Sequence, residues 1–243
     1  MQALATPIIA IVQGARAYTF VRRAADAGGA TYVPNVTDVP ALAEQRPGTV
    51  FEDGRCYVLV PDKFYRYEDR LSYLRDLYPQ VRLERIAVSA LPQLGAMAVY
   101  DADERVPPSL RSGNHVNELF LHCAGHLAEA TPTMGFAFFC EGSTWLTLLR
   151  AGEVVLSRNL PVQAHSDAVF HLAAMLGHYG LDRATTRMVV AGRIAPEGQL
   201  QRELEIYFRV EDVSVALAAQ ALTPPLELLL AYQDAVRSPI ASA

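Results

Sequence analysis

The chain has 243 residues, of which 51% are apolar and 19% are charged, and its formal net charge is −5. These proportions suit a soluble globular protein with one large domain or two small ones. The negative charge argues against a nucleic-acid partner, because a protein that neutralises phosphates needs a surplus of Lys and Arg. No stretch approaches the roughly 18 unbroken apolar residues of a membrane-spanning helix, so we expect no membrane partner.

The cysteines and lysines exclude further classes of protein. Cys56, Cys123 and Cys140 are odd in number and far apart, which favours reduced thiols over a disulfide framework and predicts a cytoplasmic protein. Lys63 is the only lysine and lies in "VPDKFY". A Walker-type phosphate loop, which needs GxxxxGK[ST], is therefore excluded. The start of the chain has a short apolar run and no cationic region before it, so we expect no signal peptide.

The first half of the chain predicts strands interrupted by helices. Residues 7–12 are an unbroken apolar run and predict a buried strand, and residues 15–24 alternate in the pattern of its hairpin partner. A turn at residues 26–29, a strand at 30–35 and a short helix at 37–48 are expected next. The order then continues with a strand at residues 54–61, an amphipathic helix at 62–78, strands at 81–91 and 94–102, and a short helix at 106–113.

The second half predicts a similar order of elements. Residues 114–132 are a helix or a strand-to-helix segment, and the pattern leaves the choice open. A meander of three strands is expected at residues 134–140, 145–150 and 154–159. The order then continues with a helix at residues 164–180, a strand at 185–194 and a second helix at 196–208. An apolar segment of ambiguous type at 214–222 and a closing helix at 224–238 complete it.

The expected helix at residues 62–78 is rich in tyrosine. Tyr65, Tyr67, Tyr73 and Tyr78 cannot all share one buried face of a helix with 3.6 residues per turn. Some of these rings must therefore be exposed or must contact a partner. This helix is our candidate for a protein–protein contact or for self-association.

Each half thus predicts a meander, a helix, a strand and a helix, which is the order of duplicated ribonuclease-H-like folds such as actin, sugar kinases and actin-like pilus-assembly ATPases. More closely, the chain resembles a bacterial family described as domain of unknown function 3822. The residues that carry this resemblance lie at 57–79, 150–161, 189–208 and 224–234. The resemblance implies a mixed α/β, actin-like ATPase fold in two subdomains, residues 1–112 and 113–243, with a central cleft.

The same resemblance implies where a nucleotide would bind. An actin-like ATPase presents a glycine-rich turn of each meander to the phosphates and holds Mg²⁺ through aspartates near these turns. In the first meander Gly14 is present, but Val12 and Gln13 stand where the aspartate is expected. ATP with Mg²⁺ is therefore not expected as a cofactor.

The second meander and the late strand depart from the ATPase pattern in the same way. The turn that contains Gly142, Ser143 and Thr144 has no aspartate before it, only Glu141 in the turn itself. The late glycine pair is reduced to one glycine in "VAGRIAPEG", the other position being arginine. The residues that could form an anion or nucleotide cleft are Gly14, Gly142, Ser143, Thr144, Gly192 and Arg193.

Two functional hypotheses follow. The first is a non-catalytic, cytoplasmic binding or scaffold module, a pseudo-ATPase with a degenerate nucleotide site and no catalytic residues, because lost metal-binding carboxylates remove the charge neutralisation that phosphoryl transfer needs. The second is a nucleotide-dependent switch or weak ATPase that uses the cleft between the subdomains.

A metal-dependent enzyme is a third hypothesis. His122 and His126 are spaced i,i+4, which places them on one face of a helix, but a zinc site needs further ligands, so we expect no metal. Asp101, Asp103 and Glu104 in "YDADER" are interpreted as a solvated loop, because short acidic clusters are usually exposed.

Overall fold

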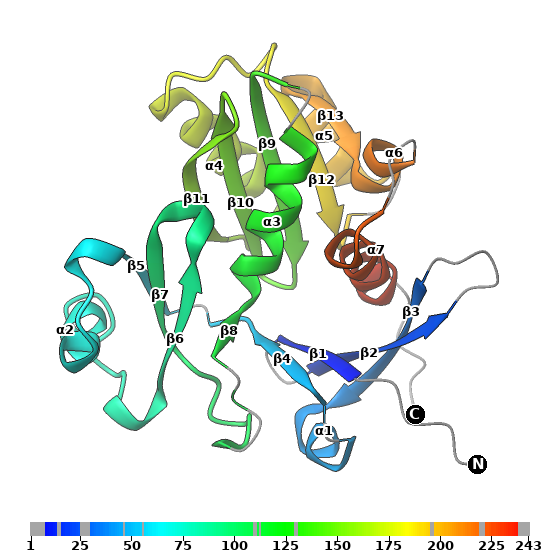
Figure 1. The fold of residues 1–243 in the computed structure, drawn as a ribbon. Helices are drawn as coiled ribbons and strands as arrows, with labels where there is room; N and C mark the ends of the chain where they lie inside the picture. Colours follow the sequence, from blue (N-terminus) through cyan, green and yellow to red (C-terminus); the bar gives the residue numbers. More distant parts are fainter. Residues whose placement is uncertain are drawn as a thin grey trace. The chain divides into compact units, whose positions relative to one another are not determined.

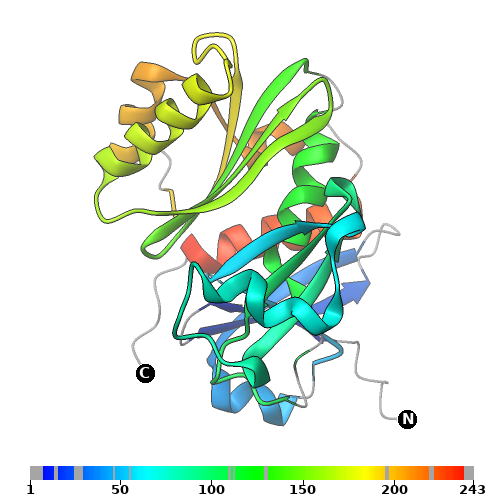
Figure 2. The same cartoon turned by 90° about the vertical axis from the view of Figure 1, so that its left-hand side faces the viewer.

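The computed structural model describes residues 8–13, 16–24, 30–45, 47–54, 56–108, 111, 113–128, 131–194, 197–218 and 222–237 (Figures 1 and 2). The chain divides into two units, Met1–Leu119 and Phe120–Ala243. The expected boundary between residues 112 and 113 lies seven residues before this division. Each unit is described by itself.

The first sheet of unit 1 has five strands in the order β3-β2-β1-β4-β8. The first three strands form an antiparallel meander, and β4 and β8 are added parallel to β1. The helix α1 (Val39–Gln45) begins after Asp38, whose carboxylate accepts the Ala41 N–H at 2.9 Å. Strand bounds are Ile8–Gln13 (β1), Arg16–Ala24 (β2), Ala30–Asp38 (β3), Thr49–Glu52 (β4) and Asn114–His115 (β8).

A second, three-stranded antiparallel sheet in unit 1 has the order β5-β7-β6. Its strands are β5 (Tyr57–Pro61), β6 (Ile86–Leu91) and β7 (Ala96–Asp101). Buried residues that include Val60 and Leu74 form its core. Of the short helix expected at residues 106–113, residues 109, 110 and 112 lie outside the described residues, and the others form no helix that the structure describes.

The single helix predicted at residues 62–78 is wrong in extent. The structure has two 3-10 turns, Asp62–Phe64 and Tyr67–Asp69, followed by the short helix α2 (Arg70–Arg75). The Tyr73 hydroxyl donates to the Phe64 carbonyl at 3.0 Å and accepts the Arg66 N–H at 2.9 Å. These backbone groups are thus satisfied by a side chain instead of by a continuous helix.

Unit 2 has one five-stranded sheet in the order β11-β10-β9-β12-β13. The predicted meander is confirmed as β9, β10 and β11, and β12 and β13 continue the sheet parallel to β9. The strand β13 was not predicted. Strand bounds are Thr133–Cys140 (β9), Ser143–Arg150 (β10), Glu153–Pro161 (β11), Arg187–Gly192 (β12) and Arg209–Asp212 (β13).

Helices cover both faces of this sheet (Figures 1 and 2). On one face Ala137 and Phe139 pack in a core that also holds residues of α4 and α5. On the other face Phe138 stacks between Phe120 of α3 and Tyr232 of α7, with ring centroids 4.7 and 4.9 Å apart. The helices are α3 (Val116–Ala128), α4 (His165–His178), α5 (Gln199–Tyr207), α6 (Val213–Leu217) and α7 (Pro224–Arg237).

The strand β9 shows why the sequence folds in this way. Successive side chains of a strand point to opposite faces, so "TMGFAFFC" can bury apolar side chains on both sides of the sheet. The segment whose type was left open, residues 114–132, is the short strand β8 followed by α3. The predicted mixed α/β class is confirmed. None of the helices in the described ranges is both long and apolar enough to span a membrane.

Candidate functional site

The topology of unit 2 brings most of the predicted site residues to one edge of its sheet. The strands β9, β12 and β13 are parallel, so their carboxyl ends lie together. Ligands of open α/β sheets bind outside the carboxyl ends of such strands. We call the end residues Glu141, Gly142, Gly192, Arg193 and Asp212 the carboxyl edge of unit 2. Gly14, the predicted site residue of the first meander, lies outside the described residues.

Gly192 is held between a strand and a helix. Its φ is +83°, and a Cβ atom at this position would lie 2.3 Å from the carbonyl oxygen of Phe139 in β9. Its N–H donates to Oε1 of Gln233 at 3.3 Å, and its carbonyl accepts from Nε of Arg237 at 2.9 Å. Both side chains belong to α7. The two backbone polar groups of Gly192 are therefore satisfied by the closing helix.

The charges of the carboxyl edge are paired within unit 2. Arg237 donates to Oδ2 of Asp212 at 2.5 Å, and the N–H of Ser214 donates to Oδ1 at 2.9 Å. Burial would raise the pKa of Asp212, but the hydrogen bonds from Arg237 and Ser214 outweigh it and lower this pKa. Arg193 forms an ion pair with Glu141 at 3.1 Å, and both side chains are exposed.

The β9–β10 turn separates an exposed glycine from two buried hydroxyls. Gly142 has a φ of +72° and open space around it, as a turn glycine requires. Ser143 and Thr144 are buried. The Ser143 hydroxyl accepts a hydrogen bond from Asn159 at 3.3 Å, and the Thr144 hydroxyl has no partner among the described residues. The structure thus brings Gly142–Thr144, Gly192 and Arg193 together, with the hydroxyls inside the unit.

The histidines of α3 lie in different environments. His122 is exposed and His126 is half-buried. Cys123 between them is buried, its thiol donates to the Pro225 carbonyl at 3.6 Å, and burial raises the pKa of this thiol. Within the described ranges, no three or more His, Cys, Asp or Glu side chains form a group that could hold a metal ion.

Unit 1 contains a pocket that the sequence did not indicate. Its volume is about 420 Å³. The solvated-loop interpretation of the "YDADER" cluster is wrong for Asp101 and Asp103, whose side chains are only 10% and 19% exposed, and fits Glu104, which is 74% exposed. We call this the charged pocket, and its lining residues are Asp53, Cys56, Arg85, Asp101, Asp103, Glu104 and Arg105.

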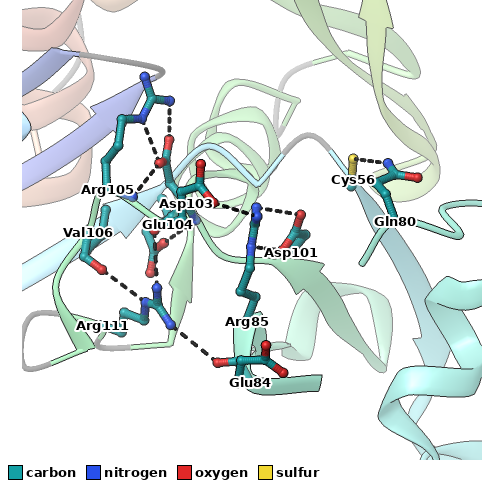
Figure 3. Close-up of polar contacts among 11 residues, drawn as sticks. Cys56, Gln80, Glu84, Arg85, Asp101, Asp103, Glu104, Arg105, Val106 and Arg111 are labelled. Carbon is teal, nitrogen blue, oxygen red and sulfur yellow. Dashed lines mark hydrogen bonds and ion pairs between the residues drawn. The ribbon is translucent and has the colours of Figure 1, made fainter. Parts of the chain in front are cut away.

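Two arginines hold the carboxylates of the charged pocket. Arg85 pairs with Asp101 at 2.8 Å and with Glu104 at 3.0 Å, and Arg105 pairs with Asp103 at 2.5 Å (Figure 3). Burial raises the pKa of Asp101 despite Arg85. For Asp103 the effect of burial is outweighed by the hydrogen bonds from Arg105, which lower its pKa.

A buried carboxylate lies behind the wall of the charged pocket. Glu52 at the end of β4 is 1% exposed, and its Oε2 accepts the Asp103 N–H at 3.2 Å. Its Oε1 has no partner in the part of the chain that the structure describes. Burial raises the pKa of Glu52 to about 7, against the Asp103 hydrogen bond and the charge of Arg111.

Arg111 and His115 fix the surroundings of this carboxylate. Arg111 donates to the carbonyls of Val106, Asp103 and Glu84 at 3.2, 3.4 and 3.4 Å, and so ties the turn after β7 to the segment before β6 (Figure 3). Burial lowers the pKa of His115 to about 4. Because its Nδ1 accepts the Asn117 N–H, its Nε2 carries the proton and donates to the Gly54 carbonyl at 3.1 Å. This histidine is therefore neutral.

Comparisons with known proteins identify the fold. The model of the family described as protein of unknown function (DUF3822) matches residues 50–210. A solved structure from Bacteroides thetaiotaomicron, a protein with actin-like ATPase fold and unknown function, superposes with a TM-score of 0.70 at 8% identity over 85% of this chain and 90% of that one. The search of curated proteins finds no match.

A second solved structure extends the likeness over nearly the whole chain. The PilM–PilN type IV pilus biogenesis complex gives a TM-score of 0.55 at 13% identity, covering 96% of this chain and 99% of that one. At such identities the likeness shows the fold alone. The predicted actin-like ATPase fold is thereby confirmed.

Proposed function

This chain belongs to the DUF3822 family, and we propose that it is a non-catalytic binding or scaffold module that acts in the cytoplasm on a protein partner or on another copy of itself. The observation that carries the proposal is the internal pairing at the carboxyl edge of unit 2. The Gly192 N–H is bonded to Gln233, and Arg193 is paired with Glu141.

These contacts oppose the binding of a phosphate at this edge. A phosphate site in such a fold needs free backbone N–H groups and a surplus of positive charge. At the carboxyl edge the charges of Arg193 and Arg237 are offset by Glu141 and Asp212. A phosphate would have to displace Glu141 from Arg193 and Gln233 from Gly192. Both exchanges weaken its binding.

The alternative is a nucleotide-dependent switch or weak ATPase that uses Gly14, Gly142, Ser143, Thr144, Gly192 and Arg193. One observation favours it. The Glu141–Arg193 pair is exposed, and an exposed ion pair contributes roughly 0–1 kcal/mol. Arg193 could therefore leave Glu141 at small cost and meet an anion.

A protein partner is supported by exposed apolar side chains on unit 1. Phe64, Tyr67 and Leu77 are 64%, 64% and 66% exposed, and we call them the aromatic surface. In contrast, Tyr65, Tyr73 and Tyr78 are half-buried and pack against the core of the three-stranded sheet. Exposed apolar groups that gather in one segment are typical of interaction sites, and aromatic residues are enriched at interfaces.

Cations accompany the aromatic surface. The Lys63 ammonium lies 4.9 Å from the centre of the Phe64 ring, and the Arg70 guanidinium lies 4.1 Å from the centre of the Tyr67 ring. These cation–π contacts hold the two rings in place without burying them. The rings therefore remain available to a partner. The PilM–PilN structure, a complex of two proteins that includes this fold, also supports a protein partner.

The aromatic surface can be tested with a photoreactive residue. With p-benzoylphenylalanine in place of Phe64, we expect a protein cross-link, to a partner or to a second copy, in cells that express the chain. The double substitution Tyr67→Ser and Leu77→Ser should abolish this cross-link. It should change the free energy of unfolding by only about 0.5 kcal/mol per site, because both side chains are exposed.

The control places the same photoreactive residue at Phe170, an exposed position of α4 in unit 2. We expect no cross-link of matching size from this position. A cross-link at position 64 that survives the double substitution, or the absence of any cross-link there, would contradict a role of the aromatic surface in partner binding.

A further inference from the structure

The charged pocket is open to solvent, and its lining carries an excess of negative charge. Its lining has four carboxylates, those of Asp53, Asp101, Asp103 and Glu104, against the guanidinium groups of Arg85 and Arg105. The net charge of the lining is therefore −2. Its volume of about 420 Å³ falls in the range of pockets that bind small ligands, roughly 300–1,000 Å³. A positively charged group is the ligand that this lining favours.

A second sign is the buried Glu52, which contacts the lining residue Asp103 without lining the charged pocket itself. It is 1% exposed, its Oε2 is bonded to the N–H of the lining residue Asp103, and its Oε1 has no partner in the described ranges. A buried charge without a cation close by is costly. The groups that act on it are Arg111, Asp103 and the buried Tyr100. Arg111 donates to three carbonyls, not to Glu52, so a cation in the charged pocket would offset the Glu52 charge.

The carboxylates of the pocket already bind guanidinium groups. Arg85 and Arg105 contact them at N–O distances of 2.5 to 3.0 Å. Arg105 is bound by its own neighbour, Asp103, and its side chain is 46% exposed. It can therefore turn into solvent and leave its place to an arriving cation.

The Cys56 thiol in the lining of the charged pocket is not suited to act as a nucleophile. Burial and then the charge of Asp101 raise the pKa of Cys56, so the thiol is protonated and is a weak nucleophile. Its Sγ atom lies 3.9 Å from Nε2 of Gln80. Cys56 instead offers a reporter for the pocket, because a bound ligand would shield it from alkylation.

We propose that the charged pocket binds a cationic side chain, the guanidinium of an arginine or the ammonium of a lysine, that a protein partner inserts into it. This identification of the ligand as a partner's side chain rests on the proposed function. Binding and the ionisation of Glu52 are coupled: a cation favours the ionised carboxylate, and the ionised carboxylate binds the cation more tightly. Binding therefore strengthens as the pH rises.

The test uses N-acetyl-arginine amide as the probe and N-acetyl-citrulline amide as its neutral counterpart. The protein is the full chain with Cys140→Ser, in which Cys123 is fully buried and Cys56 is the accessible thiol. At about pH 8, and at ten times a Kd of about 1 mM, the arginine probe should slow the alkylation of Cys56 by iodoacetamide roughly tenfold. The citrulline probe should have no effect.

Two variants locate the effect in the pocket. The double substitution Asp53→Asn and Glu104→Gln should remove the protection, whereas Glu203→Gln with Glu205→Gln on α5 changes the net charge equally and should leave it intact. Unfolding midpoints of both variants show that they fold. At about pH 5.5 the protection should be several-fold weaker, and Glu52→Gln should abolish this pH dependence.

Equal protection by citrulline, equal loss in the α5 variant, or no protection at all would overturn the proposal. These outcomes are separate from those of the proposed function. A nucleotide that binds and stabilises the protein would overturn the proposed function and leave the protection of Cys56 unchanged. If the arginine probe did not protect Cys56, the observation that carries the proposed function, the internal pairing at the carboxyl edge of unit 2, would be unaffected.

Discussion

Replacing Gly192 with alanine is expected to destabilise the protein by about 3 kcal/mol or more, since two penalties add. The φ of +83° is unfavourable for any residue with a Cβ atom, and this Cβ would lie 2.3 Å from the Phe139 carbonyl oxygen. That oxygen also accepts the Arg193 N–H at 2.8 Å, so it cannot move away without losing this hydrogen bond. Urea unfolding of the purified protein measures the loss.

Gly152→Ala is the matched control for this prediction. Gly152 has a similar φ of +80°, but no atom lies within 4 Å of the added Cβ. Gly152→Ala should lower the free energy of unfolding by about 1 kcal/mol, which is the cost of the backbone conformation alone. Equal losses of stability in the two variants would show that the close approach of β9 and β12 at Gly192 contributes nothing to the destabilisation. The expected difference would assign Gly192 to strand packing.

Glu52→Gln is expected to stabilise the protein by about 3 kcal/mol near pH 8 and to have little effect near pH 4, because the folded-state pKa of Glu52 is raised to about 7 from an ordinary value of 4.5. Below about pH 4.5 the carboxyl is neutral in both states. Between 4.5 and 7 it ionises in the unfolded state first, so stability falls as the pH rises. Above 7 it is ionised in both states, and the full cost of the buried charge is present.

Glutamine removes this cost because it stays neutral and can still accept the Asp103 N–H. The measurement is the free energy of unfolding at both pH values. Glu104→Gln, at a side chain that is 74% exposed, is the control, and its effect should stay within about 1 kcal/mol at both pH values. A Glu52→Gln effect of the same size at the two pH values would contradict the buried-carboxylate interpretation.

Elements with a strong local pattern were predictable from the sequence. The meander of unit 2 follows from apolar strands separated by short turns, and Gly142 marks the first turn through its positive φ. The strand β13 was missed because "RVED" has one apolar residue and no alternation that points to a strand. The helix at residues 62–78 failed because the Tyr73 hydroxyl competes for backbone groups seven and nine residues away.

The candidate sites depend on contacts between distant residues, and these were not predictable. Gln233 and Arg237 reach Gly192 across 41 and 45 residues, and nothing in "AYQDAVR" indicates that they do so. The charged pocket joins Cys56, Arg85 and Asp101 from three separate segments. The sequence did indicate that Gly192 and Arg193 lie near the β9–β10 turn, because the fold inferred by resemblance orders these strands.

The central claim, that the carboxyl edge of unit 2 is paired internally and binds no nucleotide, is tested most directly by thermal unfolding with and without millimolar ATP and Mg²⁺, beside ADP and AMP. We predict a midpoint that stays within about 1 °C for every nucleotide. A ligand at one hundred times its Kd would stabilise the folded state by about 2.7 kcal/mol and raise the midpoint by roughly 5–10 °C. A rise of that size that disappears in Arg193→Ala would contradict the claim and establish the nucleotide-dependent switch.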